Sequence, residues 1–240
     1  MSAGVWARSW LFTTLIVIWT TFASFAFLPS LLQRRWTIAA IRFWIGGIMR
    51  LARTVAGVTY RIEGRENIPA GPCIIAAQHQ SAFETYLLFT LLDRPVFILK
   101  RELAKLPIIG WYIKRAGLVD IDRSAGAAAL RWTLLCSQAA LARGEQVIIF
   151  PEGTTVPPGV WRPYRPGVAA LYRQCDAPVI PVALNSDYCW GKIRVLKRPG
   201  EITVRFLPAL PAGLRKDEVL DVLRKRIEAA ARAMPGWPAT

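Results

Sequence analysis

The single histidine of the chain, His79, lies five residues before an acidic side chain, Glu84, in the stretch His-Gln-Ser-Ala-Phe-Glu. This stretch follows a short apolar run that predicts a buried strand, residues 73–77, and it leads into a predicted helix, residues 82–92. A carboxylate bound to one ring nitrogen fixes the tautomer of a histidine and leaves the other nitrogen to take a proton from a hydroxyl group. The spacing therefore indicates a general-base pair.

The same residues also fit a purely structural interpretation. Ser81 and Glu84 form the pattern S-x-x-E, in which the two side chains satisfy backbone N–H groups at the start of a helix. An acidic residue in the first turn is also favoured by the helix dipole. The pattern alone leaves open whether Glu84 orients His79 or only caps a helix.

A second group of polar residues follows another apolar run. Glu152, Gly153 and Thr154 belong to the sequence Phe-Pro-Glu-Gly-Thr-Thr, at the end of a predicted strand, residues 147–150. Proline and glycine turn the chain sharply, so the polar side chains project from the end of the strand. Ligands of open α/β sheets bind beyond the carboxyl ends of the strands, which makes this turn a candidate binding element. An ordinary turn that ends a strand is the alternative.

Two basic residues occupy similar positions. Lys100 follows a predicted strand, residues 95–99, and Arg123 closes the sequence Ile-Asp-Arg. A lysine ammonium at a strand end can stabilise a developing oxyanion or bind a phosphate, and the planar fork of arginine suits a phosphate. Taken singly, each residue is more typical of a solvated surface charge.

The elements that must position these residues alternate between strands and helices. Strands are predicted at residues 73–77, 95–99, 147–150, 179–184 and 202–206, and helices at residues 82–92, 125–143, 168–174 and 215–234. This alternation favours an α/β sheet with helices on its faces.

The N-terminal residues predict a membrane anchor. Residues 9–33 carry no charge, and the run is long enough to cross a hydrocarbon layer of ~30 Å as a helix. It is too long for the apolar core of a signal peptide. A second apolar stretch, residues 36–58, carries three arginines on one helical side, as in an amphipathic helix that lies among lipid head groups. One span and a two-helix hairpin that bends at Pro29 both remain open.

Charge predicts the orientation of this anchor. The first 62 residues contain seven arginines and no acidic residue, and most of the arginines follow the first apolar run. The positive-inside rule then places the rest of the chain in the cytoplasm, at the inner membrane. We expect residues 1–57 to form the anchoring segment and residues 58–240 the catalytic domain.

Composition limits the partners. The net charge of +15 fits either nucleic acid or an anionic bilayer with phosphate-bearing substrates. The sequence has neither zinc-finger spacing nor the aromatic, glycine-rich signature of an RNA-binding sheet, so we expect a phospholipid bilayer and no nucleic acid. The four cysteines lie far apart and one histidine is present, which predicts reduced thiols and no metal site.

Four of these motifs together resemble a known family. The four motifs are residues 79–84, residues 100–110 with Ile-Asp-Arg at 121–123, residues 150–153, and Val-Ile-Pro-Val at 179–182. Their order along the chain is typical of lysophosphatidic acid acyltransferases, which belong to the glycerolipid acyltransferase superfamily. The resemblance covers roughly residues 60–205. It implies the fold of that superfamily, a mixed sheet flanked by helices.

The resemblance also implies a reaction. His79 would be the general base for an acceptor hydroxyl, Glu84 would orient it, and Lys100 would lie near the thioester carbonyl or the acceptor phosphate. The hydroxyl would attack acyl-CoA or acyl carrier protein directly, without an acyl-enzyme, so no serine or cysteine nucleophile is required. The resemblance implies no metal or other cofactor either. The product would be phosphatidic acid, formed by acylation of the second hydroxyl of 1-acyl-glycerol 3-phosphate.

Substrate contacts follow from the same resemblance. Arg123 and the turn of Glu152, Gly153 and Thr154 would bind the glycerol phosphate, and Pro181 would shape the floor of the acyl pocket. Two positions depart from the family pattern, since the usual aspartate is Glu84 here, and Thr155 stands where arginine is frequent.

The second departure keeps other acceptors open. A lyso-ornithine lipid or another lysophospholipid is the alternative acceptor, because one candidate phosphate contact is missing at Thr155. A non-catalytic membrane lipid-binding module, in which Glu84 is only a helix cap, is the alternative of a different class.

Overall fold

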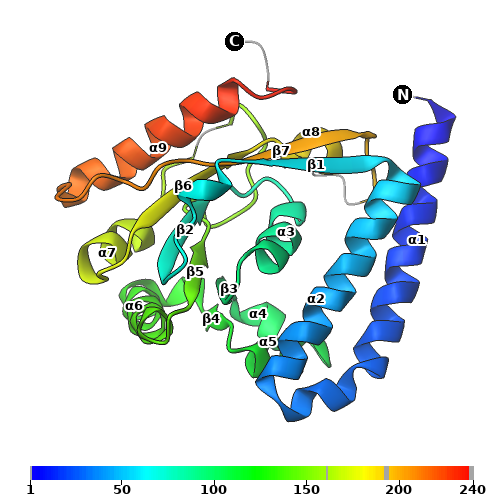
Figure 1. The fold of residues 1–240 in the computed structure, drawn as a ribbon, viewed down its shortest axis with the longest axis horizontal. Helices are drawn as coiled ribbons and strands as arrows, with labels where there is room; N and C mark the ends of the chain where they lie inside the picture. Colours follow the sequence, from blue (N-terminus) through cyan, green and yellow to red (C-terminus); the bar gives the residue numbers. More distant parts are fainter. Residues whose placement is uncertain (1, 161, 192–194, 238–240) are drawn as a thin grey trace.

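The chain folds around one mixed β-sheet, described here from a computed structural model that covers residues 2–160, 162–191 and 195–237 (Figure 1). The strand order is β1-β7-β6-β2-β5-β3-β4. Neighbouring strands run parallel, apart from the antiparallel pair of β6 and β7. The strands are β1 (Val58–Glu63), β2 (Cys73–Ala77), β3 (Pro95–Lys100), β4 (Val119–Ile121), β5 (Gln146–Ile149), β6 (Val179–Leu184) and β7 (Gly200–Phe206).

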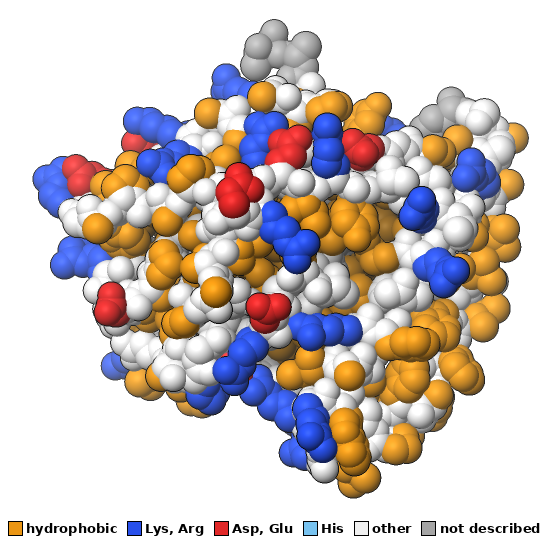
Figure 2. All heavy atoms as spheres, in the orientation of Figure 1, with side chains coloured by type: hydrophobic (Ala, Val, Ile, Leu, Met, Phe, Trp, Pro, Cys, Tyr) orange, Lys and Arg blue, Asp and Glu red, His pale blue; other side chains and the backbone are white. Residues whose placement is uncertain are grey.

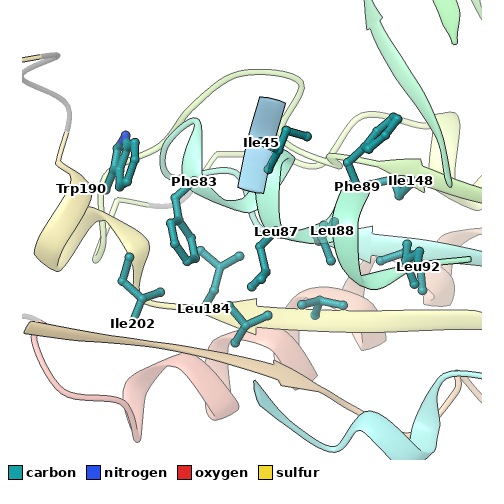
Figure 3. Packing of buried hydrophobic residues seen from close by; sticks show 14 of the residues in the cluster. Ile45, Phe83, Leu87, Leu88, Phe89, Leu92, Ile148, Leu184, Trp190 and Ile202 are labelled. Atoms are coloured by element: carbon teal, nitrogen blue, oxygen red, sulfur yellow. The ribbon is translucent and has the colours of Figure 1, made fainter. Parts of the chain in front are cut away.

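Helices cover both faces of this sheet. They are α3 (Phe83–Leu91), α4 (Arg101–Ala104), α5 (Ile109–Ala116), α6 (Gly126–Ala142), α7 (Gly167–Gln174), α8 (Ser186–Trp190) and α9 (Lys216–Arg232). Helices α3 and α8 pack on one face, where Phe83, Leu87 and Trp190 join the buried cluster of Figure 3. Helices α6, α7 and α9 pack on the other. The prediction of an α/β sheet flanked by helices is therefore confirmed.

Strand β2 shows why the sheet is buried on both sides. Side chains alternate between the faces of a strand, and Ile75 lies in the cluster beneath α3 whereas Ile74 and Ala76 lie in the cluster beneath α6, α7 and α9. All five residues of β2 are buried. A continuous apolar run, rather than an alternating one, is what a parallel strand covered on both faces requires.

The N-terminal residues form a two-helix hairpin. Helix α1 (Ala3–Ala26) and helix α2 (Arg34–Leu51) are joined by a 3₁₀ turn, η1 (Leu28–Leu32), which contains Pro29 (Figure 1). The Trp19 indole donates a hydrogen bond of 2.8 Å to the carbonyl of Trp44. Gly47 allows this close approach, because a Cβ atom there would lie 2.4 Å from Nε1 of Trp19. The two helices thus form a hairpin with Pro29 at its bend.

Arginines of helix α2 bind it to the sheet domain. Arg42 donates to the carbonyls of Leu92 and Asp93, each at 2.7 Å, and Arg34 forms an ion pair of 2.6 Å with the buried Glu145. A short π-helix, η2 (Ala52–Ala56), leads from α2 into β1. The hairpin is thus part of the packed molecule.

The outer side of the hairpin is apolar. Among the described residues, α1 is the one helix long and apolar enough to cross a membrane, as judged by length and composition, and little of it is buried. Figure 2 shows hydrophobic side chains gathered over this outer side. Large exposed apolar residues here are Trp10, Leu11, Val17, Ile18, Phe22, Phe25, Leu32 and Phe43.

Candidate active site

Four adjacent strands end at one edge of the sheet and carry the candidate residues there. Strands β6, β2, β5 and β3 lie side by side and run parallel, so their carboxyl ends meet. His79 follows β2, Phe150 follows β5, Lys100 ends β3 and Ser186 follows β6. The edge beyond parallel strands is where open α/β sheets bind their ligands.

The predicted pair is present at this edge. Nδ1 of His79 lies 2.9 Å from Oε1 of Glu84, which is fully buried in the first turn of α3. The other ring nitrogen, Nε2, has no hydrogen bond to any residue that the structure describes, and the histidine lines a cavity. A ring held at Nδ1 and free at Nε2 has the geometry of a general base.

Glu84 also satisfies the start of its helix. Oε1 accepts hydrogen bonds from the backbone N–H groups of Gln80 and Ser81, each at 2.7 Å. The Ser81 hydroxyl lies 3.0 Å from Oε2 and accepts from the N–H of Phe83 at 3.1 Å. The contacts expected from both interpretations are therefore present, because the carboxylate that accepts from these N–H groups also lies beside His79.

A residue that the sequence analysis missed completes this network. Ser186, fully buried in α8, donates a hydrogen bond of 2.8 Å to Oε2 of Glu84, and its Oγ lies 2.8 Å from that of Ser81. The polar run Asn-Ser-Asp directly after the apolar strand β6 was the available signal. Its meaning depends on β6 lying beside β2, which is a long-range pairing.

We expect replacement of Ser186 by alanine to lower about tenfold the turnover of the acyl transfer that the sequence resemblance implies. A hydrogen bond to a charged group contributes about 1.5–3 kcal/mol, and the remaining donors hold Glu84 in part. Ser137→Ala is the matched control, because Ser137 is equally buried on α6 and its hydroxyl has no partner within the described residues. Steady-state kinetics on the two purified variants check this, and equal turnover in both contradicts it.

The ring of His79 is supported from the turn after β5. It stacks on Phe150 with ring centroids 4.2 Å apart and an interplanar angle of 17°. Its backbone carbonyl accepts from the N–H of Val156 at 2.7 Å. Since the side chain is bound at Nδ1 and stacked on one face, the position of Nε2 is fixed before any substrate arrives.

A cavity of about 480 Å³ opens beside His79, within the range of about 300–1,000 Å³ that is usual for ligand sites. Its walls are mainly apolar and come from the sheet domain and from the hairpin. The hairpin contributes Thr20, Ala23, Ser24, Phe27, Ala40, Ile41, Trp44 and Ile45. The hairpin and the sheet domain therefore build one cavity together, suited to an apolar chain whose reactive end lies near His79.

The predicted binding residues fall into two groups. Lys100 and Thr154 line the cavity, as does Thr155. Gly153, with φ of 67°, turns the chain directly before Thr154, and a Cβ atom there would lie 2.7 Å from Nε of Arg165. The turn therefore requires glycine in order to present the threonines.

Two further predicted residues are Pro181 and Arg123. Pro181 is buried within β6, where it pairs with Ala76 of β2, and it does not line the cavity. The backbone of Arg123 begins a 3₁₀ turn, Arg123–Ala125, after β4, and its side chain lies outside the described part of the structure. Within the described residues no group of three or more His, Cys, Asp or Glu side chains is placed to hold a metal ion.

Glu152 is buried beneath the turn rather than exposed in the cavity. Burial raises the pKa of its carboxyl group from 4.5 to about 7, and the negative charge of Glu84 adds to this, whereas hydrogen bonds from the backbone N–H groups of Glu152 and His79 oppose it. Its Oε2 has no hydrogen-bond partner among the described residues. Glu152 thus supports the backbone of His79 from below.

We expect the stability of the protein to fall between pH 5 and pH 8 because of Glu152. With a folded pKa of about 7 against an ordinary 4.5, the folded state holds more protons than the unfolded state in this window, so the free energy of unfolding decreases as pH rises. The full effect is about 3 kcal/mol as an upper value. Glu152→Gln removes it. In melting curves, the stability of the variant relative to the wild type should be greater at pH 8 than at pH 5.

The control for this measurement is Glu66→Gln, a substitution of an exposed glutamate in the loop after β1. It should change stability equally at both pH values. If Glu152→Gln behaves in the same way, the carboxyl group is ionised throughout this range and its burial has no such effect.

Comparison with known proteins decides the family. The sequence profile of the family described as Acyltransferase matches residues 59–185, more than half of the chain. The chain belongs to the acyltransferase family. The match includes the His79–Glu84 pair and the turn after β5, and it ends one residue before Ser186. The resemblance inferred from the four motifs is confirmed.

Individual relatives agree with this family. The acyltransferase is 35% identical over 212 residues to a 1-acyl-sn-glycerol-3-phosphate acyltransferase of Pseudomonas aeruginosa, across 88% of the chain and 82% of that protein. It is 31% identical over 173 residues to the mouse 1-acyl-sn-glycerol-3-phosphate acyltransferase alpha, across 70% of the chain and 61% of that protein.

A solved structure has the same fold. The crystal structure of the 1-acyl-sn-glycerophosphate acyltransferase PlsC from Thermotoga maritima superposes with a TM-score of 0.77, across 96% of the acyltransferase and 98% of that chain, at 22% identity. The superposition takes in nearly all of the acyltransferase, so it includes the N-terminal hairpin as well as the sheet domain. The fold predicted from the resemblance, a mixed sheet flanked by helices, is confirmed.

Proposed function

We propose that this acyltransferase transfers a fatty acyl group to the second hydroxyl of 1-acyl-glycerol 3-phosphate and forms phosphatidic acid. The observation that carries the proposal is the His79–Glu84 pair at 2.9 Å beside a largely apolar cavity of about 480 Å³. The names of the relatives from Pseudomonas aeruginosa and mouse support the choice of acceptor.

In the proposed reaction Nε2 of His79 takes the proton of the acceptor hydroxyl as its oxygen attacks the thioester carbonyl. The new C–O bond forms a tetrahedral oxyanion, which collapses with cleavage of the C–S bond. The thiolate leaves and takes the proton from His79. Glu84 holds the ring and stabilises the imidazolium that forms between the two steps. Direct transfer of this kind needs no acyl-enzyme.

The polar end of the acceptor lies at the mouth of the cavity in this proposal. Lys100 faces the oxyanion or the phosphate, and Arg123 with the turn of Glu152 and Gly153 shapes the phosphate site. Thr154 lines the cavity next to this turn. Because Glu152 is buried, its part is to hold the turn and the backbone of His79 rather than to touch the anionic phosphate.

The membrane supplies the acceptor. We propose that residues 1–57 anchor the protein in the inner membrane through the apolar outer side of the hairpin, with the catalytic domain, residues 58–240, facing the cytoplasm. The seven arginines among the first 62 residues support this orientation. An acyl-CoA or acyl carrier protein in the cytoplasm then meets the membrane-borne acceptor at one site.

The test is acyl transfer by the purified full chain. Lysophosphatidate and acyl-CoA should yield a free thiol and a diacyl product in equal amounts. A lyso-ornithine lipid and a zwitterionic lysophospholipid complete the panel, because Thr155 replaces an arginine that is frequent in the family. A preference for either of these acceptors replaces the phosphatidate proposal. Absence of thiol release with all three acceptors refutes the enzymatic function.

A further inference from the structure

A row of large apolar side chains is exposed on helices α4 and α5 and on the turn between them, next to the cavity. It consists of Leu103, Leu106, Ile109 and Trp111, whose exposed fractions are 46%, 43%, 42% and 55%. We call these four residues the α4–α5 ridge. An exposed apolar cluster of this kind on a protein surface usually marks a site that binds another protein or a membrane.

The fold holds the ridge in place. Between the two helices the chain makes a tight turn, in which the N–H of Gly110 donates to the carbonyl of Leu106 at 2.8 Å. Ile108 has φ of 62°, which is strained for a β-branched residue. A Cβ atom at Gly110 would lie 2.2 Å from the carbonyl oxygen of Ala104. A specific backbone conformation, which is strained at Ile108, therefore holds the apolar residues in their outward position.

The ridge is continuous with the cavity and with the hairpin. Leu103 and Ile109 also line the cavity. The Tyr112 hydroxyl donates to the carbonyl of Ser24 in α1 at 3.1 Å, and the Arg115 guanidinium donates to the carbonyl of Leu32, whose side chain is 72% exposed at the bend of the hairpin. Apolar surface thus extends from the hairpin across α5 to the cavity.

Basic residues flank the ridge. Lys100, Arg101, Lys105, Lys114 and Arg115 are exposed in this segment, and Glu102 is the exposed acidic residue among them. Apolar side chains next to lysines and arginines are the signature of a surface that rests in the head-group region of a bilayer. Each basic side chain near anionic lipid strengthens the attraction to the bilayer.

We propose that the α4–α5 ridge is a second membrane contact, which inserts into the head-group region of an anionic bilayer on the same side as the hairpin. The mouth of the cavity then opens onto lipid between two apolar elements, so a lysophospholipid enters without crossing water. The proposal rests on the membrane location proposed above, but it does not depend on the identity of the acceptor. A second copy of the chain is the competing occupant.

The experiment places an environment-sensitive fluorophore on the ridge. The full chain carries Leu106→Cys in a Cys136→Ser background, since the other cysteines are buried, and the label is attached to position 106. With vesicles of phosphatidylcholine and phosphatidylglycerol, emission should shift to the blue and be quenched by a lipid-borne quencher. Leu135→Cys is the matched control, because Leu135 is 61% exposed on α6, and its label should not respond.

This readout is independent of acyl transfer, so failure of the proposed function leaves it unchanged. Equal responses at positions 106 and 135, or none at either, overturn the ridge as a membrane contact. A blue shift that appears without lipid and grows with protein concentration shows that a second copy covers the ridge, and it also overturns the proposal.

Kinetics provide a second measurement on Leu106→Glu combined with Trp111→Glu, since neither side chain lines the cavity. The apparent KM for lysophosphatidate in anionic vesicles should rise about tenfold, the change expected from loss of about 1.4 kcal/mol of binding. The rate with a short-chain acceptor dispersed below its micelle concentration should stay as in the wild type. Equal losses with both acceptors, in a variant that melts as the wild type does, overturn the proposal, because the ridge then does not act through the bilayer.

Discussion

Replacement of His79 by alanine is expected to lower the rate of acyl transfer by about 10²–10⁴-fold, the range that general acid–base catalysis usually contributes. His79 is the single histidine of the chain, and its Nδ1 is committed to Glu84, so no neighbouring imidazole can take over the role of Nε2. The rate of thiol release from acyl-CoA in the presence of lysophosphatidate, measured at saturating substrate, checks this result.

Two controls separate lost chemistry from lost structure. The variant should be recovered with membranes in the same yield as the wild type. Its melting temperature measures the stability lost with the stacking on Phe150 and the hydrogen bond to Glu84. Thr85→Ala changes another residue of the cavity wall and should leave the rate within a few-fold of the wild type. A His79→Ala variant with more than a tenth of the wild-type rate contradicts the general-base role.

Buried strands were the elements that the sequence predicted most accurately. The predicted bounds of β2 and β6 agree with the structure residue for residue, and the prediction for β5 differs by one residue at each end. These strands are covered on both faces, so nearly every position is apolar and the run ends where burial ends. The helices α3, α6, α7 and α9 were also predicted to within a few residues.

Elements at the edges of the sheet were not predicted. Strand β1 is an edge strand in which three of six residues are exposed, and β4 is only three residues long, so neither has a distinct apolar pattern. Helices α4, α5 and α8 are also short. Pro107 precedes α5 and Gly110 lies in its first turn, and both residues obscure a helical period. Their position is decided by packing and not by local propensity.

The sequence predicted the contacts of the candidate site that lie within a single motif. His79 and Glu84 are close in sequence, so the spacing of a strand end and a helix start brings them together. Ser186 is 102 residues from Glu84, and its contact depends on the order of strands in the sheet. The buried position of Glu152 depends likewise on what packs against its turn. A sequence pattern marks a strand end but does not reveal which side chains face inward there.

The contribution of the hairpin to the cavity could not be predicted from the sequence either. Residues 9–33 predict an apolar helix, but an apolar pattern has the same appearance whether its partner is lipid or protein. In the structure Phe12 and Ile45 are buried in the core beside the sheet, while Phe22 and Phe43 remain exposed. The division of the hairpin between these two environments follows from tertiary contacts alone.

Replacement of Glu84 by glutamine is expected to lower the rate by at least about 10²-fold, because a neutral amide neither fixes the tautomer of His79 nor stabilises the imidazolium. The buried carboxylate accepts from two backbone N–H groups and from the Ser186 hydroxyl. A glutamine has one acceptor oxygen, and its NH₂ group faces donors. The variant should therefore also lose about 1–3 kcal/mol of stability from unpaired buried groups.

Glu84→Asp separates the effect of the negative charge at residue 84 from the effect of its side-chain length. It keeps the negative charge but shortens the side chain by one methylene, so the carboxylate cannot contact His79 and Ser186 at their present positions simultaneously. We expect a loss of about tenfold, smaller than that of the amide, if charge beside His79 is what matters. In this background Ser186→Ala should have little further effect, since the hydrogen bond that it removes is already weakened. If glutamine and aspartate variants both transfer acyl groups at the wild-type rate, Glu84 serves only as a helix cap.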